Sequence, residues 1–217
     1  MNIKTFTNQQ DWVDKTILNI QSLITNHQPT SNGHSPTIAL SGGSTPSPIY
    51  KAMQKLPNIN YIDFYQVDER YIPHDHEKSN YQLIAKSLHP KHFHCFDTSL
   101  PIDQALKEYQ AILPNQFDLI ILGLGPDGHT ASLFPHSPAL TTPNPVAHTT
   151  TNQFDIKDRL TLTFTTIMKS QHLLLLLKGE DKQVVLDELL HGNKSINNFP
   201  AKKLLEHPDL IVHYCQY

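Results

Sequence analysis

The sequence predicts an α/β fold built on a mostly parallel open sheet with helices on both faces. Short apolar runs alternate with amphipathic segments along the 217 residues, and this alternation is typical of parallel strands joined by crossover helices. Several runs are apolar at consecutive positions, as in strands that are buried on both faces. Polar turns that contain glycine follow two of these runs, at 41–45 and 123–128, where ligands of open α/β sheets bind.

Local patterns define the elements in order. Residues 8–25 carry apolar side chains at helical spacing, among them Trp12, Ile17 and Ile20, and predict an amphipathic helix that packs on the sheet. The leucine run 173–177 is far shorter than the roughly 20 residues of a membrane helix and predicts a buried strand. The expected strands are 37–40, 61–67, 92–96, 117–122, 159–164, 172–178 and 211–214, and the other expected helices are 46–55, 80–88, 102–112, 165–169 and 182–190.

Length and charge limit the class of protein. A length of 217 residues favours one domain, 1–217. A net charge of −3 with scattered lysines favours neither nucleic acid nor an anionic membrane as a partner, so the expected ligand is a small molecule. The N-terminal residues lack the features of a signal peptide, and Cys95 and Cys215 stand in unrelated contexts. We therefore expect a cytoplasmic protein. The proline-rich piece 135–145 is interpreted as a surface excursion near the site, with an interdomain linker as the alternative.

The segment 122–135, LGLGPDGHTASLFP, follows the apolar run 117–122 and has the features of a catalytic loop. Its glycines allow the backbone to turn sharply and to approach a ligand closely. Asp127 and His129 then emerge at the carboxyl edge of the sheet. A histidine there suits acid/base catalysis, and Asp127 can orient its imidazole or set its tautomer, although an aspartate before glycine is also typical of a tight turn.

The turn after strand 37–40 has the composition of a phosphate-binding loop. Small side chains, hydroxyl donors and free backbone N–H groups gather where a helix begins, and such groups attract anions. The residues concerned are Ser41, Gly42, Gly43, Ser44 and Thr45. The segment lacks the ending of a Walker A loop and the GxGxxG pattern of dinucleotide-binding folds, so nucleotide binding is not indicated.

Charged residues near other strand ends are further candidates. Asp68, Glu69 and Arg70 follow an apolar strand, and Arg70 can hold a phosphate or a sugar oxygen through two hydrogen bonds. The alternative for this cluster is a solvated charged turn. Lys182 opens a helix, where the helix dipole makes a positive charge slightly unfavourable. Its presence there hints at an anionic ligand. Arg159 is a further candidate for binding the phosphate or the sugar, although it opens a strand, at the end that is normally remote from the site.

No metal and no cofactor are expected. The pairs His74/His76 and His92/His94 lack a second ligand cluster, and the HExxH and paired CxxC motifs are absent. Ser44 does not stand in a GxSxG elbow, so it is interpreted as a phosphate donor and not as the nucleophile of a serine hydrolase.

These motifs resemble those of the 6-phosphogluconolactonases. The matching segments are SGGSTP at 41–46, DERYIP at 68–73, SNY at 79–81, GLGPDGHTASLFP at 123–135 and RLTLT at 159–163. The resemblance implies a Rossmann-like fold of the phosphosugar isomerase/lactonase type. It also implies hydrolysis of 6-phospho-D-glucono-1,5-lactone to 6-phosphogluconate, the second step of the oxidative pentose phosphate pathway, without a metal or organic cofactor.

Carried over to this sequence, the resemblance makes His129 the residue that activates water, with Asp68 and Asp127 lining the site. Phosphate or sugar binding then falls to Gly42, Gly43, Ser44, Thr45, Arg70 and Lys182. The sequence departs from the family pattern before Arg159, where lactonases commonly carry prolines and this chain reads NQFDIKD. The segment 199–217 is only loosely similar.

In the expected mechanism, His129 takes a proton from water that attacks the lactone carbonyl and then protonates the departing ring oxygen. Arg70 or loop N–H groups are the candidate donors to the oxyanion. One alternative is a glucosamine-6-phosphate deaminase, which shares the phosphate loop but needs more acid/base groups, whereas 130–138 contains no carboxylate. The other is a non-catalytic sugar-phosphate sensor, which would not require the Asp127–His129 pair. The sequence does not indicate an oligomeric state.

Overall fold

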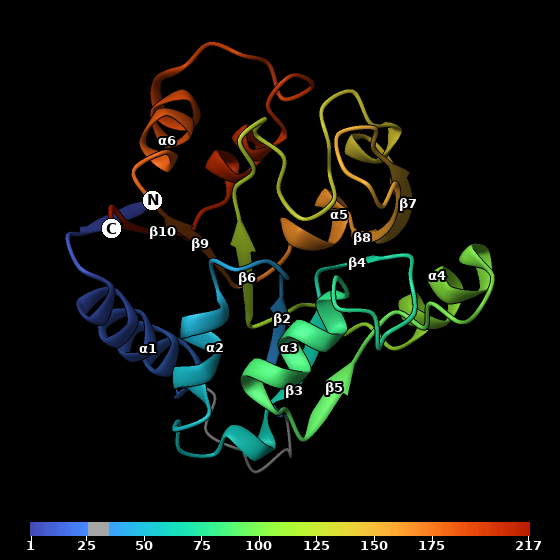
Figure 1. The fold of residues 1–217 in the computed structure, drawn as a ribbon, viewed down its shortest axis with the longest axis horizontal. Helices are drawn as coiled ribbons and strands as arrows, with labels where there is room; N and C mark the ends of the chain where they lie inside the picture. Colours follow the sequence, from blue (N-terminus) through green and yellow to red (C-terminus); the bar gives the residue numbers. More distant parts are fainter. Residues whose placement is uncertain (26–34) are drawn as a thin grey trace.

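Seven parallel strands form the main sheet of the computed structural model, which describes residues 1–25 and 35–217. The strand order is β1-β10-β9-β6-β2-β3-β5, and every neighbouring pair is parallel (Figure 1). The predicted α/β fold with a mostly parallel sheet is confirmed. The strands are β1 (Asn2–Phe6), β2 (Thr37–Leu40), β3 (Asp63–Gln66), β5 (His92–His94), β6 (Leu119–Gly123), β9 (His172–Lys178) and β10 (Leu210–Cys215).

Helices cover both faces of this sheet because the strands bury side chains on both sides. Along β9, Leu173 and Leu175 belong to one apolar cluster and Leu174 and Leu176 to the other, since successive side chains of a strand point to opposite faces. The cluster of Leu174 is completed by α1 (Gln9–Thr25), α2 (Ser47–Met53) and α3 (Asn80–Leu88). The cluster of Leu173 is completed by α4 (Ile102–Ala111), α5 (Phe164–Ile167), α6 (Lys182–His191) and the 3₁₀ helix η3 (Pro200–Glu206).

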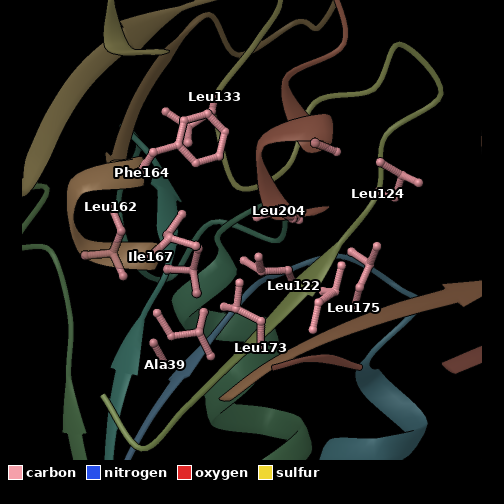
Figure 2. Packing of buried hydrophobic residues seen from close by; sticks show 14 of the residues in the cluster. Ala39, Leu122, Leu124, Leu133, Leu162, Phe164, Ile167, Leu173, Leu175 and Leu204 are labelled. Atoms are coloured by element: carbon pink, nitrogen blue, oxygen red, sulfur yellow. The ribbon is translucent and has the colours of Figure 1, made fainter. Parts of the chain in front are cut away.

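Figure 2 shows part of the cluster that contains Leu173, where sheet residues lie together with residues of α5, η3 and the chain around them. A core of this kind fixes the ends of the central strands, from which the site loops emerge. The labelled residues are Ala39, Leu122, Leu124, Leu133, Leu162, Phe164, Ile167, Leu173, Leu175 and Leu204. Two further short 3₁₀ helices, η1 (Ile59–Tyr61) and η2 (Pro138–Leu140), lie in connections.

A smaller antiparallel sheet begins just after β3 in the chain. It contains β4 (Asp68–Arg70), β8 (Asp158–Leu162) and β7 (Val146–Thr150), in the order β4-β8-β7. The strand predicted at 159–164 therefore exists, but it pairs antiparallel with β4 and does not join the main sheet. Four of the five residues of β8 are buried, so an apolar pattern alone does not distinguish the two sheets.

Other differences from the prediction have similar causes. The predicted strand 61–67 shortens to β3, after which the chain enters β4. Strand β1 was not predicted because it lies at the sheet edge with mostly exposed side chains and has no apolar run.

Helix α3 has both of its predicted ends, and the Ser79 side chain caps it by accepting a hydrogen bond from the backbone N–H of Gln82.

Strands β2 and β6 lie side by side at the centre of the sheet, and the chain leaves them in opposite directions. From β2 it continues to β3 and β5, and from β6 to β9 and β10. Their following loops diverge and leave a crevice at the carboxyl ends, the usual place for a ligand in an open α/β sheet. Both of the glycine-containing turns noted in the sequence follow these two strands.

Candidate active site

A cavity of about 250 Å³ lies at the carboxyl ends of β2 and β6, beside β4 and the start of β8. Its wall combines the two glycine-containing turns with residues of the smaller sheet. The lining residues are Ser41, Gly42, Gly43, Ser44, Thr45, Pro46, Asp68, Arg70, Asn80, Gly123, Leu124, Gly125, His129, Ala131, Ser132, Phe134, Phe154 and Arg159.

His129 lies on this wall and is oriented by Asp127. The Nδ1 atom of His129 lies 2.5 Å from Oδ1 of Asp127, and the same oxygen accepts the backbone N–H of His129 at 3.2 Å. A carboxylate partner at Nδ1 favours the proton on that nitrogen and leaves Nε2 as the basic nitrogen. Among the described residues, Nε2 has no hydrogen-bond partner. The imidazole is therefore arranged to accept a proton.

Asp127 stands behind the imidazole and does not line the cavity. Burial raises the pKa of its carboxyl, but the hydrogen bonds and the charge of His129 outweigh burial, so that the pKa lies below its ordinary value. The carboxylate form is thus favoured next to the imidazole.

Gly125 lets the His129 ring lie directly against the backbone. A Cβ at position 125 would overlap the imidazole, and the Gly125 backbone N–H donates to the His129 carbonyl at 2.9 Å. The turn from 125 to 129 therefore closes on itself and needs a residue without a side chain at its first position.

The turn after β2 presents a row of open backbone donors. In the described part of the chain, no hydrogen-bond partner is found for the N–H groups of the four residues 42–45. Gly43 has φ +91°, a conformation that favours glycine. Unpaired N–H groups that face a cavity form a favourable setting for an anion, which agrees with the composition of this turn.

Asn80 packs on this turn, and sequence reasoning missed it as a site residue. It is 2% exposed, its Nδ2 donates to the Asp68 carbonyl at 2.9 Å, and a Cβ on Gly42 would overlap its amide. Within the described residues, its Oδ1 and the Ser41 Oγ are buried without a partner. The only signal in the sequence was its place in the SNY segment.

Two arginines face each other across the smaller sheet. Arg70 on β4 and Arg159 on β8 are directly paired in register, and both line the cavity. Burial lowers the pKa of the Arg159 guanidinium, Asp68 opposes this effect, and the nearby Arg70 adds to it. Like charges directly opposite each other on a sheet are destabilising, so this arrangement favours an anion between them.

Arg159 was a candidate for substrate binding even though it opens its strand, the end that is normally remote from the site, and the structure places it on the cavity wall. Because β8 runs antiparallel to β4, its first residues lie at the cavity and not at the far edge. The Arg159 Nε donates to the Ile156 carbonyl at 3.1 Å, while Arg70 donates through Nη1 to the Lys78 carbonyl. Neither arginine forms an ion pair with a described residue.

The two carboxylates of the DER segment have different surroundings. Asp68 is on the cavity wall, where its Oδ2 accepts the Ser132 hydroxyl at 2.6 Å. Glu69 is fully buried away from the cavity and accepts hydrogen bonds from five groups: Gln66 Nε2, the Ser79 hydroxyl and the backbone N–H groups of Arg70, Asn80 and Tyr81. It thereby ties β4 to the start of α3 and places Arg70 and Asn80.

Lys182 lies at the start of α6, as expected, but not on the cavity wall. Its Nζ donates to the Leu124 carbonyl at 2.9 Å, so it holds the loop that leads to His129.

The proline-rich excursion 135–145 also stays off this wall. Pro135 and Pro138 instead line a separate hollow with His148.

One histidine of each sequence pair makes contacts that stabilise the fold. His74 bonds to the Phe96 carbonyl at 2.8 Å and stacks on Tyr81, and His94 pairs with Asp63 at 3.1 Å. In the ranges 1–25 and 35–217, no group of three or more His, Cys, Asp or Glu residues is placed to hold a metal ion.

Comparisons with known proteins agree with this geometry. The sequence profile of the glucosamine-6-phosphate isomerases/6-phosphogluconolactonase family matches residues 8–212. A probable 6-phosphogluconolactonase of Dictyostelium discoideum is 36% identical over 196 residues, which cover 82% of this chain and 83% of that protein. The 6-phosphogluconolactonase of Synechocystis is 31% identical over 228 residues, which cover 96% of this chain and 93% of that protein.

A solved structure gives the same result for the fold. The crystal structure of 6-phosphogluconolactonase from Thermotoga maritima matches with a TM-score of 0.86 at 30% identity, covering 100% of this chain and 99% of that one. The chain therefore belongs to the glucosamine-6-phosphate isomerase/6-phosphogluconolactonase family.

Proposed function

We propose that this chain is a 6-phosphogluconolactonase, a carboxylic ester hydrolase that converts 6-phospho-D-glucono-1,5-lactone to 6-phospho-D-gluconate. The reaction is the second step of the oxidative pentose phosphate pathway. One observation carries the proposal: an aspartate-oriented histidine shares the wall of one cavity with two arginines that have no ion-pair partner in the described part of the chain. The relatives named above point to the same reaction.

His129 acts as the general base and then as the general acid. Its Nε2 removes a proton from water while the water oxygen forms a bond to the lactone carbonyl carbon. The tetrahedral intermediate then collapses as the bond from that carbon to the ring oxygen breaks, and the imidazolium returns the proton to this oxygen. Asp127 keeps the imidazole in the required tautomer and stabilises its charged form.

The phosphate anchors the substrate away from the reacting carbon. Arg70 and Arg159 hold it from the smaller sheet, and the N–H groups of 42–45 with the hydroxyls of Ser44 and Thr45 add further donors. Binding at a distance fixes the carbonyl relative to His129, which lowers the entropic barrier to attack. Asp68 offers its carboxylate to the sugar hydroxyls, and Lys182 supports the loop that carries His129.

The deaminase alternative is not favoured. Glucosamine-6-phosphate deamination needs more acid/base groups, and no carboxylate is present in 130–138. A sensor without catalytic activity would have no use for the orientation of His129 by Asp127.

The proposed substrate is a small phosphosugar lactone, and nucleic acid and membranes are not proposed as partners. No described helix is long and apolar enough to cross a membrane. A cytoplasmic location remains a prediction from the sequence, with which the free thiols of Cys95 and Cys215 are compatible.

The test is continuous hydrolysis of freshly prepared 6-phosphogluconolactone, coupled to 6-phosphogluconate dehydrogenase and corrected for spontaneous hydrolysis. We expect an enzyme-dependent rate that His129→Ala abolishes. No acceleration by folded protein would refute the proposal. Ammonia release from glucosamine 6-phosphate would support the deaminase, and saturable 6-phosphogluconate binding without turnover would support the sensor.

A further inference from the structure

Phe154 is an aromatic residue on the wall of the cavity that also holds His129 and the two arginines. Its side chain remains 42% exposed, whereas the neighbouring Phe134 is 4% exposed. Exposed aromatic surface is unfavourable in water, so a large ring left open inside a binding cavity suggests that a ligand covers it.

The ring of Phe154 lies close to both chemical parts of the site. Its centroid is 5.9 Å from that of the His129 imidazole, in an edge-on arrangement, and 6.0 Å from that of Phe134. The Arg159 guanidinium carbon lies 5.5 Å from the same centroid. A ligand that reaches from the arginines to His129 is therefore within reach of this ring.

The loop that carries Phe154 is held in place by its own contacts. Residues 151–157 connect β7 to β8, and the Thr151 backbone N–H donates to the Lys157 carbonyl at 3.1 Å. Asp155 pairs with Lys78 at 2.9 Å, and Arg159 bonds to the Ile156 carbonyl. The position of the ring thus follows from the backbone around it.

We propose that Phe154 is a substrate-positioning residue whose ring packs against the apolar C–H face of the lactone ring, between the arginines and His129. A sugar lactone has hydroxyls around its rim and C–H groups on its faces, and an aromatic ring is the protein surface that fits such a face. The inference rests on the proposed function, because it takes the lactone as the ligand. It also gives a role to the NQFDIKD segment, in which this chain departs from its family's pattern.

Kinetics of Phe154→Ala give the first test. Packing that is equal in the ground state and the transition state changes KM and leaves kcat nearly unchanged. We expect KM to rise about 2-fold to 10-fold, with kcat within about twofold of the wild type. Phe154→Tyr retains the ring and should keep the wild-type KM. Asn152→Ala, an exposed substitution in the same loop, is the matched control and should change neither value.

A merely structural role gives a different result. If Phe154 served only to support the imidazole, Phe154→Ala would lower kcat with little change in KM. Phe154→Gln replaces the ring by a polar side chain and provides a second variant if the alanine variant unfolds. An unchanged KM in a folded alanine or glutamine variant would overturn the proposal.

Fluorescence gives a second and direct test, because the sequence has one tryptophan, Trp12, and it is buried outside the cavity. The His129→Ala/Phe154→Trp variant should change its emission on rapid mixing with nucleotide-free 6-phosphogluconolactone, and inorganic phosphate should not reproduce that change. The control is His129→Ala/Tyr61→Trp, at an exposed position off the cavity, which should not respond.

The failure of this inference and the failure of the proposed function give different results. Normal wild-type hydrolysis together with a silent tryptophan at 154, or with an unchanged KM in the alanine variant, rejects the role of Phe154 alone. Absence of hydrolysis by the wild-type protein rejects both.

Discussion

Arg70 and Arg159 are paired directly across strands β4 and β8, with both side chains on the wall of the same cavity and no ion-pair partner among the described residues. Two adjacent positive charges of this kind are stabilised when an anion lies between them. The relationship explains why the phosphate is assigned to this side of the cavity and leads to the first prediction.

Replacing either arginine by glutamine should weaken substrate binding more than it slows catalysis. A hydrogen bond to a charged group contributes about 1.5–3 kcal/mol, so KM should rise roughly 10-fold to 100-fold while kcat changes less. Steady-state kinetics of Arg70→Gln and Arg159→Gln check this. Lys91→Gln removes one exposed cation elsewhere and serves as the charge control. Wild-type KM values in both arginine variants would place the phosphate elsewhere.

The His129–Asp127 pair should govern kcat. Loss of a positioned general base typically lowers the rate about 10²-fold to 10⁴-fold, and we expect His129→Ala to do so with little change in KM. Asp127→Asn keeps the size of the side chain but removes its charge, and should lower kcat in the same direction by a smaller factor. A normal kcat for His129→Ala, measured with the coupled assay, would rule out the mechanism.

Gly125→Ala should inactivate the enzyme without unfolding it. The added methyl group would overlap the His129 ring and displace it from Asp127, so kcat should fall by at least about tenfold. The comparison variant is Asn152→Ala, an exposed substitution off the cavity wall, which should keep the wild-type kcat. A wild-type kcat in Gly125→Ala, at an unchanged melting temperature, would contradict the close approach of ring and backbone.

Acid should destabilise the protein through His213. Burial lowers its pKa from 6.5 to about 4, and the positive charge of Lys4 adds to this effect. Between these two pH values the unfolded chain binds a proton that the folded chain does not, so stability falls as the pH decreases from about 6.5 to 4. A shift of this size corresponds to roughly 3 kcal/mol.

Denaturant unfolding at pH 7, 5.5 and 4.5 measures this effect. His213→Gln should show a smaller loss of stability over that range and normal hydrolysis at pH 7, since His213 bonds to Thr16 and lies outside the cavity. An identical pH dependence in the variant and the wild type would remove His213 as the cause.

The central part of the fold could be predicted because its strands are buried on both faces. The leucines of β9 and the branched residues of β6 form runs that few other structures accommodate. The edge strand β1 has exposed side chains and gives no such signal. Apolar periodicity does not encode the antiparallel pairing of β8 with β4, so it provides no reason to expect the first residues of β8, Arg159 among them, at the cavity.

The residues of the site also differ in whether the sequence could predict them. His129, Asp127 and the turn at 42–45 could be predicted because each follows a strand in the chain with a recognisable local pattern. Phe154 and Asn80 reach the cavity through tertiary structure: Phe154 at the tip of a hairpin loop, Asn80 through the hydrogen bonds that tie α3 to Asp68 and Glu69. Apart from the place of Asn80 in the SNY segment, no local pattern marks these two residues.

The pairing of β1 with β10 has a consequence for folding during synthesis. Asn2 pairs with Ile211, so β1 leaves the ribosome about 200 residues ahead of its partner strand, a delay of roughly 10–40 s at ordinary rates of translation. Until then β1 has no edge to join, and the charge of Lys4 disfavours its pairing with another chain, as charged side chains do on edge strands. We expect the rest of the sheet to assemble first and β1 to dock last, closing a contact between distant parts of the chain.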